Sequence, residues 1–341
     1  MRSLFALVAG LVLAGAAAAG TARIAVVPDV QNYVSTIDAG DDAMRVKLLD
    51  AMVDDILAWK PDFAIQVGDL TDSTGGADQM GRGWLDDDPN SQGTPADAEW
   101  KRIRSKMFDR LDAAGIPHLE VTGNHDSGVD YARYFPAEEF KARPWFYAVL
   151  SRKPAWKDPI ADTTQRAALM PTPIGAICVI GQPFTGVHGS IDTDWLLAQV
   201  GCGARRPTIL VQHGGLTNDV LAALAAAPAE TKSLVIASVE GHFVCTGCVM
   251  MNQLKYARPG LESALQIKAN WQETSFGPPG GTNHTGLSWW AQWTIDPKAG
   301  KSILTAHNPY LGISNARLDA GYTNANGPLT LPFNGCGMFS C

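Results

Sequence analysis

The sequence predicts an α/β fold in which buried β-strands alternate with amphipathic helices. Short β-branched apolar runs recur along the chain, and their near-continuous apolar character is typical of strands covered on both faces. Segments with apolar residues at helical spacing lie between these runs, which gives the strand-helix order of layered α/β proteins. Of the 341 residues, 46% are apolar, so the chain can bury a substantial core.

The predicted strands are 23–28, 63–67, 118–122, 176–180, 208–212 and 233–239, and the predicted helices are 42–59, 94–114, 192–200 and 217–226. The first helix is indicated by apolar pairs that recur every three or four positions from Leu48 to Leu57. The second begins at Thr94 and Pro95, a hydroxyl cap followed by a proline at the first helical position.

The first 19 residues are typical of a secretory signal peptide. Arg2 precedes an apolar run from Leu4 to Leu13, and small residues follow up to Gly20. A transmembrane helix, the alternative interpretation, needs about 20 apolar residues, and this run is shorter. We therefore expect a secreted or periplasmic protein without a membrane span after signal cleavage.

The rest of the chain is expected to form one domain over residues 20–313. Residues 72–93 are rich in Gly, Asp, Ser and Pro without an apolar period, which predicts a surface loop near the strand ends. Residues 314–341 are expected to form an irregular, Cys-containing tail that packs on the domain.

Six cysteines follow the predicted signal peptide, and they are Cys178, Cys202, Cys245, Cys248, Cys336 and Cys341. An even number in an exported protein favours disulfides. Fifteen pairings are open, and the short loops favour 245 with 248 and 336 with 341, which leaves 178 with 202. A four-thiolate zinc site would need a second Cys-x-x-Cys, and Cys245-x-x-Cys248 is the only one in the sequence. This pair also lacks the helix-opening context of a thioredoxin-like redox motif.

The charge and the aromatic content of the chain limit which binding partners are expected. The formal net charge is −7, and no long Lys/Arg cluster occurs, so we expect no nucleic-acid-binding surface. Trp289, Trp290 and Trp293 permit a sugar-stacking interpretation, but their alternation along a predicted strand favours packing in the core. His118, His188 and His307 are expected to be structural or merely exposed.

Candidate metal-binding side chains fall at the carboxyl ends of successive predicted strands. They are Asp29, Gln31, Asp69, Asn124, His125, Asp126, His213 and His242. Sites form at such strand ends in layered α/β folds, and glycines beside the candidates permit tight turns. Carboxylates, an amide and imidazoles together suit divalent Mn, Fe or Zn.

Five ordered segments resemble the motifs of the calcineurin-like metallophosphoesterase family. The segments are Asp29-Val30-Gln31, Gly68-Asp69-Leu70-Thr71-Asp72, Gly123-Asn124-His125-Asp126, the segment around His213, and Gly241-His242. The similarity extends over about residues 23–309. It implies a four-layer fold of two packed β-sheets flanked by helices, with a two-metal site at one edge.

The resemblance also implies residue roles. Asp69 would bridge two divalent ions, and Asn124, His213 and His242 would complete one site. Asp29 and Gln31 would belong to the other site. His125 would act as general acid or charge stabiliser beside the leaving group, with Asp126 as an orienting partner.

Two positions depart from the family pattern at the same metal site. Gln31 stands where most members have His, as in a Gln-containing branch of the family, and Val244 stands where the last motif has its second His. Cys245 or His284 would be conceivable replacement ligands. The depleted site leaves open whether one or two ions bind.

The sequence thus predicts an exported, metal-dependent phosphoesterase that hydrolyses a phosphomonoester or phosphodiester with metal-activated water. Its substrate would be a small-molecule or polymeric phosphate ester. The alternative is a mononuclear or catalytically impaired relative that binds a ligand. A glycan-directed surface protein is a third hypothesis, for which the sequence supplies no motif.

Overall fold

The structure is a computed structural model of the chain. It describes residues 20–35, 42–72, 95–126, 128–150, 164–184, 191–242, 248–253, 261, 264–270, 288–314, 317–319, 322–324 and 329–332. The predicted signal peptide and most of the 72–93 loop lie outside these residues. Within them, no helix is both long enough and apolar enough to span a bilayer.

The first of two large sheets contains both ends of the described chain. Its spatial order is β13 (Ile313–Ser314), β12 (Lys301–Asn308), β11 (Trp290–Asp296), β1 (Ala22–Val27), β2 (Phe63–Gln66) and β3 (His118–Glu120), and β16 (Leu329–Pro332) also pairs with β12. Strands β1, β2 and β3 are parallel, so their carboxyl ends lie at one edge. The remaining strands pair antiparallel.

The second sheet has the order β4 (Phe146–Leu150), β5 (Gln165–Met170), β6 (Ile177–Gln182), β7 (Thr208–Gln212), β8 (Val235–Glu240), β10 (Leu265–Asn270) and β9 (Cys248–Gln253). Strands β6, β7, β8 and β10 are parallel. A separate pair joins β14 (Arg317–Asp319) to β15 (Tyr322–Asn324). The second sheet therefore also presents several carboxyl ends at one edge.

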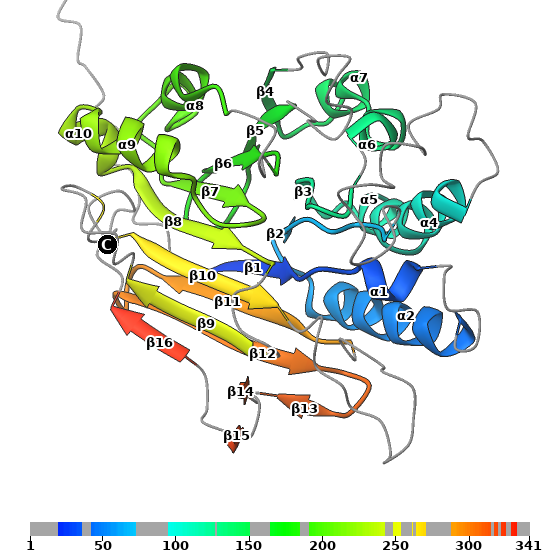
Figure 1. The fold of residues 1–341 in the computed structure, drawn as a ribbon. Helices are drawn as coiled ribbons and strands as arrows, with labels where there is room; N and C mark the ends of the chain where they lie inside the picture. The colour runs from blue at the N-terminus through cyan, green and yellow to red at the C-terminus, as the bar shows by residue number, and fades with distance from the viewer. Residues whose placement is uncertain are drawn as a thin grey trace, which may run out of the picture.

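Helices flank the two sheets. They are α1 (Gln31–Val34), α2 (Asp42–Trp59), α4 (Pro95–Ile103), the π-helix η3 (Arg104–Phe108), α5 (Asp109–Ala113), α6 (Gly128–Tyr134), α7 (Ala137–Lys141), α8 (Thr193–Gln199), α9 (Asn218–Ala226) and α10 (Ala229–Lys232). Figure 1 shows α8, α9 and α10 gathered beside β6 to β8, and α1 and α2 on the opposite side of the molecule.

Two apolar clusters hold these layers together. The larger joins the inner faces of both sheets and includes Val26, Ile65, Val179 and Val211. The smaller joins the outer face of the second sheet to α8 and α9 through residues such as Ile180, Leu210, Leu196 and Leu221. The predicted four-layer α/β fold, with two packed sheets flanked by helices, is therefore confirmed.

Most predicted elements are present with small changes at their ends. Helix α2 has the predicted bounds, while the predicted helix 94–114 consists of α4, η3 and α5 in succession. The tail after residue 313, expected to be irregular, contains three short strands. One of them, β16, extends the first sheet beside β12.

The three clustered tryptophans belong to the core, as predicted. Trp289, Trp290 and Trp293 are fully buried. The Trp290 indole donates to the Asp55 carboxylate on α2, which attaches that helix to the first sheet. A sugar-stacking role would require exposed rings, and these rings are covered.

One predicted disulfide lies within the described residues. Cys178 on β6 is bonded to Cys202, which follows α8. Both are buried in the smaller apolar cluster. The predicted pairings 245–248 and 336–341 lie outside the residues whose side chains are described.

Candidate metal centre

The two sheets bring the carboxyl ends of five strands to one place. Asp29 and Gln31 follow β1, Asp69 follows β2, and Asn124 follows β3. From the second sheet, His213 follows β7 and His242 follows β8. Parallel pairing aligns the strand ends within each sheet, and the packing of the two sheets against each other brings the two edges together.

His213 lies at the centre of the cluster. Its Nδ1 lies 2.9 Å from the backbone carbonyl of Val67, which fixes Nδ1 as the donor and directs Nε2 toward the other candidates. Nε2 is 3.0 Å from Oδ1 of Asn124 and 3.3 Å from Oδ2 of Asp69. Three donor atoms from different strand ends thus surround one point.

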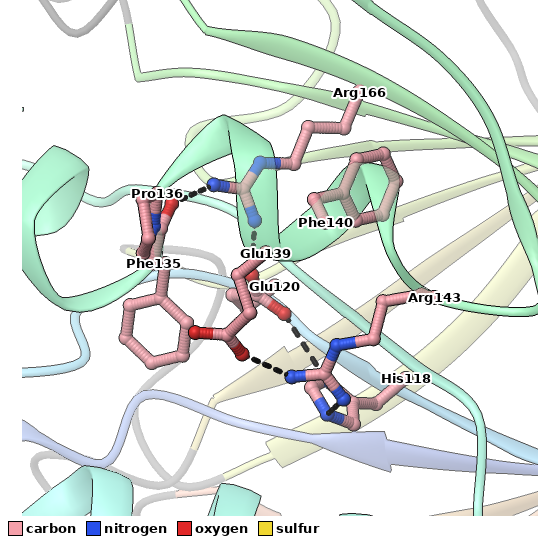
Figure 2. Close-up of a pocket in the computed structure, with 8 residues that line it drawn as sticks. All are labelled: His118, Glu120, Phe135, Pro136, Glu139, Phe140, Arg143 and Arg166. Atoms are coloured by element: carbon pink, nitrogen blue, oxygen red, sulfur yellow. Dashed lines mark hydrogen bonds and ion pairs between the residues drawn. The ribbon is translucent and has the colours of Figure 1, made fainter.

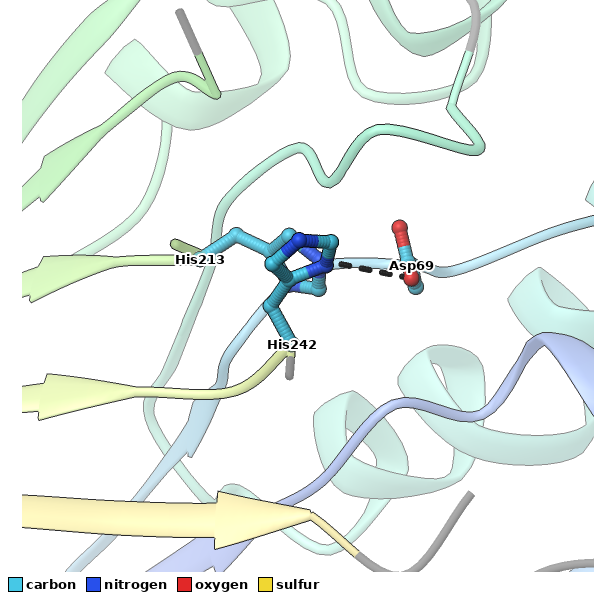
Figure 3. Close-up of side chains that lie close together, drawn as sticks. All are labelled: Asp69, His213 and His242. Atoms are coloured by element: carbon cyan, nitrogen blue, oxygen red, sulfur yellow. Dashed lines mark ion pairs between the residues drawn. The ribbon is translucent and has the colours of Figure 1, made fainter. Parts of the chain in front are cut away.

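His242 completes this group. Asp69, His213 and His242 each offer a ligand atom, and these atoms all lie within 4.8 Å of one another. The rings of His213 and His242 have centroids 4.9 Å apart (Figure 3). Ligands around one zinc-like ion with bonds of about 2.1 Å stand about 3.0 to 3.4 Å apart, so modest side-chain adjustment suffices to bind an ion.

Two of the candidate ligands have left-handed backbone conformations. Asp69 has φ 52° and His242 has φ 57°. Residues other than glycine rarely adopt this region, and strained residues of this kind cluster at functional sites. This conformation bends the chain sharply after each strand and directs the two side chains toward the shared edge.

Glycines make room for the carboxylates. A Cβ added at Gly123 would lie 2.0 Å from Oδ1 of Asp69, and one added at Gly241 would lie 2.3 Å from Oδ1 of Asp29. Such approaches are far inside van der Waals contact. Each glycine therefore permits a close passage that no other residue type allows.

Two buried side-chain oxygens at this edge are available to a ligand. Oε1 of Gln31 accepts no hydrogen bond from the described residues, and Oδ2 of Asp69 lies 3.3 Å from its ion-pair partner, Nε2 of His213. Burying a polar atom without a partner is costly, so the Gln31 oxygen favours a bound cation. Together with the imidazoles and the amide, the two oxygens form a donor set that fits a divalent cation.

Asp29 lies on the other side of His213. Its Oδ1 is 3.6 Å from Nδ1 of His213, and its carboxylate accepts from the His242 backbone N–H at 3.2 Å. Gln31 is anchored by its own N–H, which donates to the Asp69 carbonyl at 2.9 Å. Asp29 and Gln31 therefore lie beside the cluster of Asp69, Asn124, His213 and His242, and their role in an adjoining site stays a prediction.

The buried carboxylates of the site need a positive counter-charge. Burial by itself lowers the pKa of the His213 imidazole, but the carboxylates of Asp69 and Asp29 raise it to about 10. Burial raises the pKa of Asp29 to about 8, whereas burial and the nearby His213 lower the pKa of His242 to about 4. Two buried carboxylates thus require a positive charge, which either a proton or a divalent ion supplies.

His125 lies beside the cluster and is bonded to Asp72. Its backbone N–H donates to Oδ1 of Asp69 at 3.0 Å, and its Nδ1 lies 2.9 Å from Oδ1 of Asp72. Burial alone lowers the pKa of His125, but the hydrogen bond to Asp72 and the charge of Asp69 raise it. Asp72 lies in the second motif segment, yet its pairing spans 53 residues and was not predicted.

Asp126 has a different role from the one expected. Its carboxylate accepts hydrogen bonds from the backbone N–H groups of Gly123, Leu70 and Thr71 at 2.8 to 3.1 Å. It therefore joins the loops after β2 and β3. The His125 ring is instead held by Asp72, whose Oδ1 lies 2.9 Å from Nδ1.

A separate cavity lies away from this site. Its lining residues are His118, Glu120, Phe135, Pro136, Glu139, Phe140, Arg143 and Arg166 (Figure 2). The Arg166 guanidinium lies 4.8 Å from the Tyr131 ring centroid and donates to Glu120. The lining charges pair with one another, and none of the candidate metal ligands contributes to it. His118 belongs to this paired cluster, in agreement with a structural role.

Three residues that the sequence analysis singled out, Val244, Cys245 and His284, lie outside the described residues. The two conceivable replacement ligands, Cys245 and His284, therefore remain predictions.

The fold and the donor set define a class: two-sheet α/β proteins with a His/Asp group that could hold a metal. A sequence model of calcineurin-like phosphoesterases matches residues 22–242. The chain belongs to the calcineurin-like phosphoesterase family, whose members usually hydrolyse phosphate esters.

Among solved structures, the chain is similar to a dimetal phosphatase from Danio rerio. The two are 11% identical, with a TM-score of 0.49, and the match covers 92% of this chain and 99% of the other. A search of curated protein sequences finds none that matches.

Proposed function

We propose that this protein is a metal-dependent phosphoesterase that hydrolyses a phosphomonoester or phosphodiester with a metal-activated water. The observation that supports this most strongly is the convergence of Asp69, Asn124 and His213 around Nε2 of the histidine, with His242 close by. Membership of a phosphoesterase family supplies the substrate class.

Asp69, Asn124, His213 and His242 would hold one divalent ion, with Mn, Fe or Zn as the best-suited metals. When bound, such an ion neutralises charge on the phosphate and lowers the pKa of a coordinated water. The carbonyl of Val67 keeps the proton of His213 on Nδ1, which leaves Nε2 as the ligand atom.

His125 is the proposed catalytic side chain. Because Asp72 binds Nδ1, a proton given to the leaving-group oxygen would come from Nε2. General acid catalysis of this kind contributes roughly 10² to 10⁴ in rate.

Asp29 and Gln31 would contribute to a second, weaker site that shares Asp69. Gln31 is a neutral ligand, and Val244 replaces the usual second His of the last motif, so this site would have lower affinity. A mononuclear or catalytically impaired relative that binds a ligand is the second candidate function, and these two substitutions favour it.

We also propose that the protein is exported to a secreted or periplasmic location. The apolar run that precedes Gly20 supports this, and so does the Cys178–Cys202 disulfide, since disulfides persist in oxidising compartments. Detection of the protein in the periplasmic or culture fraction with its N-terminus near Gly20 would test this proposal.

Hydrolysis of 4-nitrophenyl phosphate, and of its methyl diester, by the full chain with added Mn tests the activity. His213→Ala should lower kcat at least about 100-fold, because it removes a ligand and leaves two buried carboxylates without their partner. His307→Ala is the matched control, since His307 pairs with Asp55 outside the site. Equal rates for wild type and His213→Ala would refute the proposal.

Elemental analysis separates the two candidate functions. Two equivalents of metal per chain would support the two-ion enzyme, and one equivalent with hydrolysis would support a mononuclear enzyme. One equivalent without hydrolysis of either ester, or no metal at all, would favour the ligand-binding relative.

A further inference from the structure

The Asp72 carboxylate is held from more than one direction. Its Oδ1 binds Nδ1 of His125 at 2.9 Å, and its Oδ2 accepts from the Ser35 hydroxyl at 3.2 Å. Its own backbone N–H donates to Oε2 of Glu99 at 2.9 Å. Both carboxylate oxygens and the backbone of Asp72 are thus bonded within the protein.

Ser35 comes from the loop that ends α1. It is 4% exposed, and its N–H donates to the Gln31 carbonyl at 2.9 Å. The preceding carbonyl, that of Val34, accepts from the Arg102 guanidinium of α4 at 3.3 Å. The hydroxyl of Ser35 therefore has a fixed backbone position from which to reach Asp72.

Glu99 comes from α4 and is 1% exposed. A buried carboxylate costs free energy unless its oxygens are hydrogen-bonded. One oxygen of Glu99 is used on the backbone of Asp72, at the point where the chain leaves the second motif. Helix α4 thus contacts Asp72 directly through Glu99, and Arg102 of the same helix contacts the Val34 carbonyl beside Ser35.

We propose that Ser35 and Glu99 are positioning residues that hold Asp72 against His125. Neither contacts the reacting atoms. Glu99 fixes the backbone of Asp72, and Ser35 stops its carboxylate from rotating, so that Nε2 of His125 points in one direction. This inference rests on the proposed phosphoesterase function and deepens it.

Alignment of this kind matters only for a leaving group that needs a proton. A water oxygen forms the new bond to phosphorus and loses a proton to solvent. As the P–O bond to the leaving group breaks, its electron pair goes to the leaving oxygen, which takes the proton from Nε2 of His125, and the ring regains a proton from solvent. An acid misplaced by a fraction of an ångström loses much of its effect. 4-Nitrophenolate leaves without a proton, whereas phenol has a pKa of about 10 and depends on one.

The test compares kcat for the 4-nitrophenyl and phenyl esters, as monoester or methyl diester, with the Mn-loaded full chain. Ser35→Ala and Glu99→Ala should lower kcat for the phenyl ester about tenfold or more, within the 10² to 10⁴ that an acid contributes. For the 4-nitrophenyl ester we expect a loss below about threefold, with KM unchanged for both. Glu99→Gln should restore most activity, since its amide oxygen still accepts from the Asp72 N–H.

Asp97→Asn is the matched control. Asp97 is a second buried carboxylate on α4, but its partners are Lys101 and Tyr134. This variant should leave the ratio of the kcat values for the phenyl and 4-nitrophenyl esters unchanged even if α4 becomes less stable. An equal loss for both esters in Ser35→Ala and Glu99→Ala, or the same change of ratio in Asp97→Asn, would overturn the inference. Failure of the wild-type protein to hydrolyse either ester would instead refute the proposed function.

Discussion

Nε2 of His213 lies 3.0 Å from Oδ1 of Asn124, although the two residues are 89 positions apart and belong to different sheets. Their contact therefore depends on the packing of one sheet against the other. The same contact places an imidazole nitrogen and an amide oxygen beside the carboxylate of Asp69, which is a combination suited to a borderline divalent metal.

Gln31 tests the second site. Its Oε1 is buried and accepts no hydrogen bond from the described residues, so we expect it to bind the weaker ion. Gln31→Leu should lower the affinity for the second, weakly bound Mn about 10- to 100-fold and leave the affinity for the first, tightly bound Mn unchanged. The metal-free variant should be at least as stable as wild type, because it no longer buries an unbonded oxygen.

Calorimetric titration with Mn measures the affinities for the first and second ion, and thermal denaturation without metal measures stability. Gln292→Leu, on β11 outside the site, is the control. Identical second-phase affinities in wild type and Gln31→Leu would show that Gln31 is not a ligand.

Gly123 tests the geometry around Asp69. Gly123→Ala places a Cβ 2.0 Å from Oδ1 of Asp69, so either the carboxylate or the loop must move. We expect at least about a tenfold loss of affinity for the tight Mn. In Gly115→Ala the new Cβ meets nothing within 4 Å, but the φ of 69° strains an alanine, so that variant controls for general destabilisation away from the site. Unchanged Mn affinity in Gly123→Ala would contradict the placement of Asp69.

Local patterns were sufficient to predict the elements that carry the site. Apolar residues at helical spacing between Leu48 and Leu57 gave α2 its correct bounds, and apolar runs located β1, β2 and β7 within a residue. Because parallel strands end at a common edge, the shared edge of Asp29 and Asp69 followed without knowledge of the packing, whereas the approach of His213 from the second sheet depends on that packing.

The remaining features depend on contacts between distant residues. Nothing local in the sequence pairs Asp72 with His125 instead of Asp126, because both acids stand in short polar loops after strands. The π-helix between α4 and α5 interrupts a segment that has a continuous helical pattern. Strand β16 depends on its pairing with β12, which the tail sequence does not indicate.

The Cys178–Cys202 disulfide should contribute to stability. It closes a loop with a sequence separation of 24, for which the chain-entropy account gives roughly 3 kcal/mol. We expect the Cys178→Ala, Cys202→Ala double variant to unfold at lower urea concentration than wild type. Reduction of wild type should produce a similar loss, and a reductant should have no further effect on the variant if the bond is the cause.

The buried Glu120–Arg166 pair predicts a pH dependence of stability. Burial alone would raise the pKa of Glu120, but Arg166 and His118 hold it below its ordinary value of 4.5. The carboxylate therefore stabilises the fold above about pH 4.5, and this contribution is lost as the pH falls through its lower folded-state pKa.

Glu120→Gln should consequently lower the free energy of unfolding at pH 7 by about 3 kcal/mol or more, since it leaves Arg166 buried without its charge partner. The difference from wild type should shrink below pH 4.5. Urea unfolding at pH 7 and at pH 3.5 measures both values, and a difference that grows on acidification would contradict the assignment.

The most direct test of the central claim is a crystal structure of the Mn-soaked protein with anomalous scattering data. We predict an Mn peak with ligand atoms of Asp69, Asn124, His213 and His242 at about 2.0 to 2.3 Å. A protein that binds no Mn at this edge, or binds it without these four side chains, would contradict the claim.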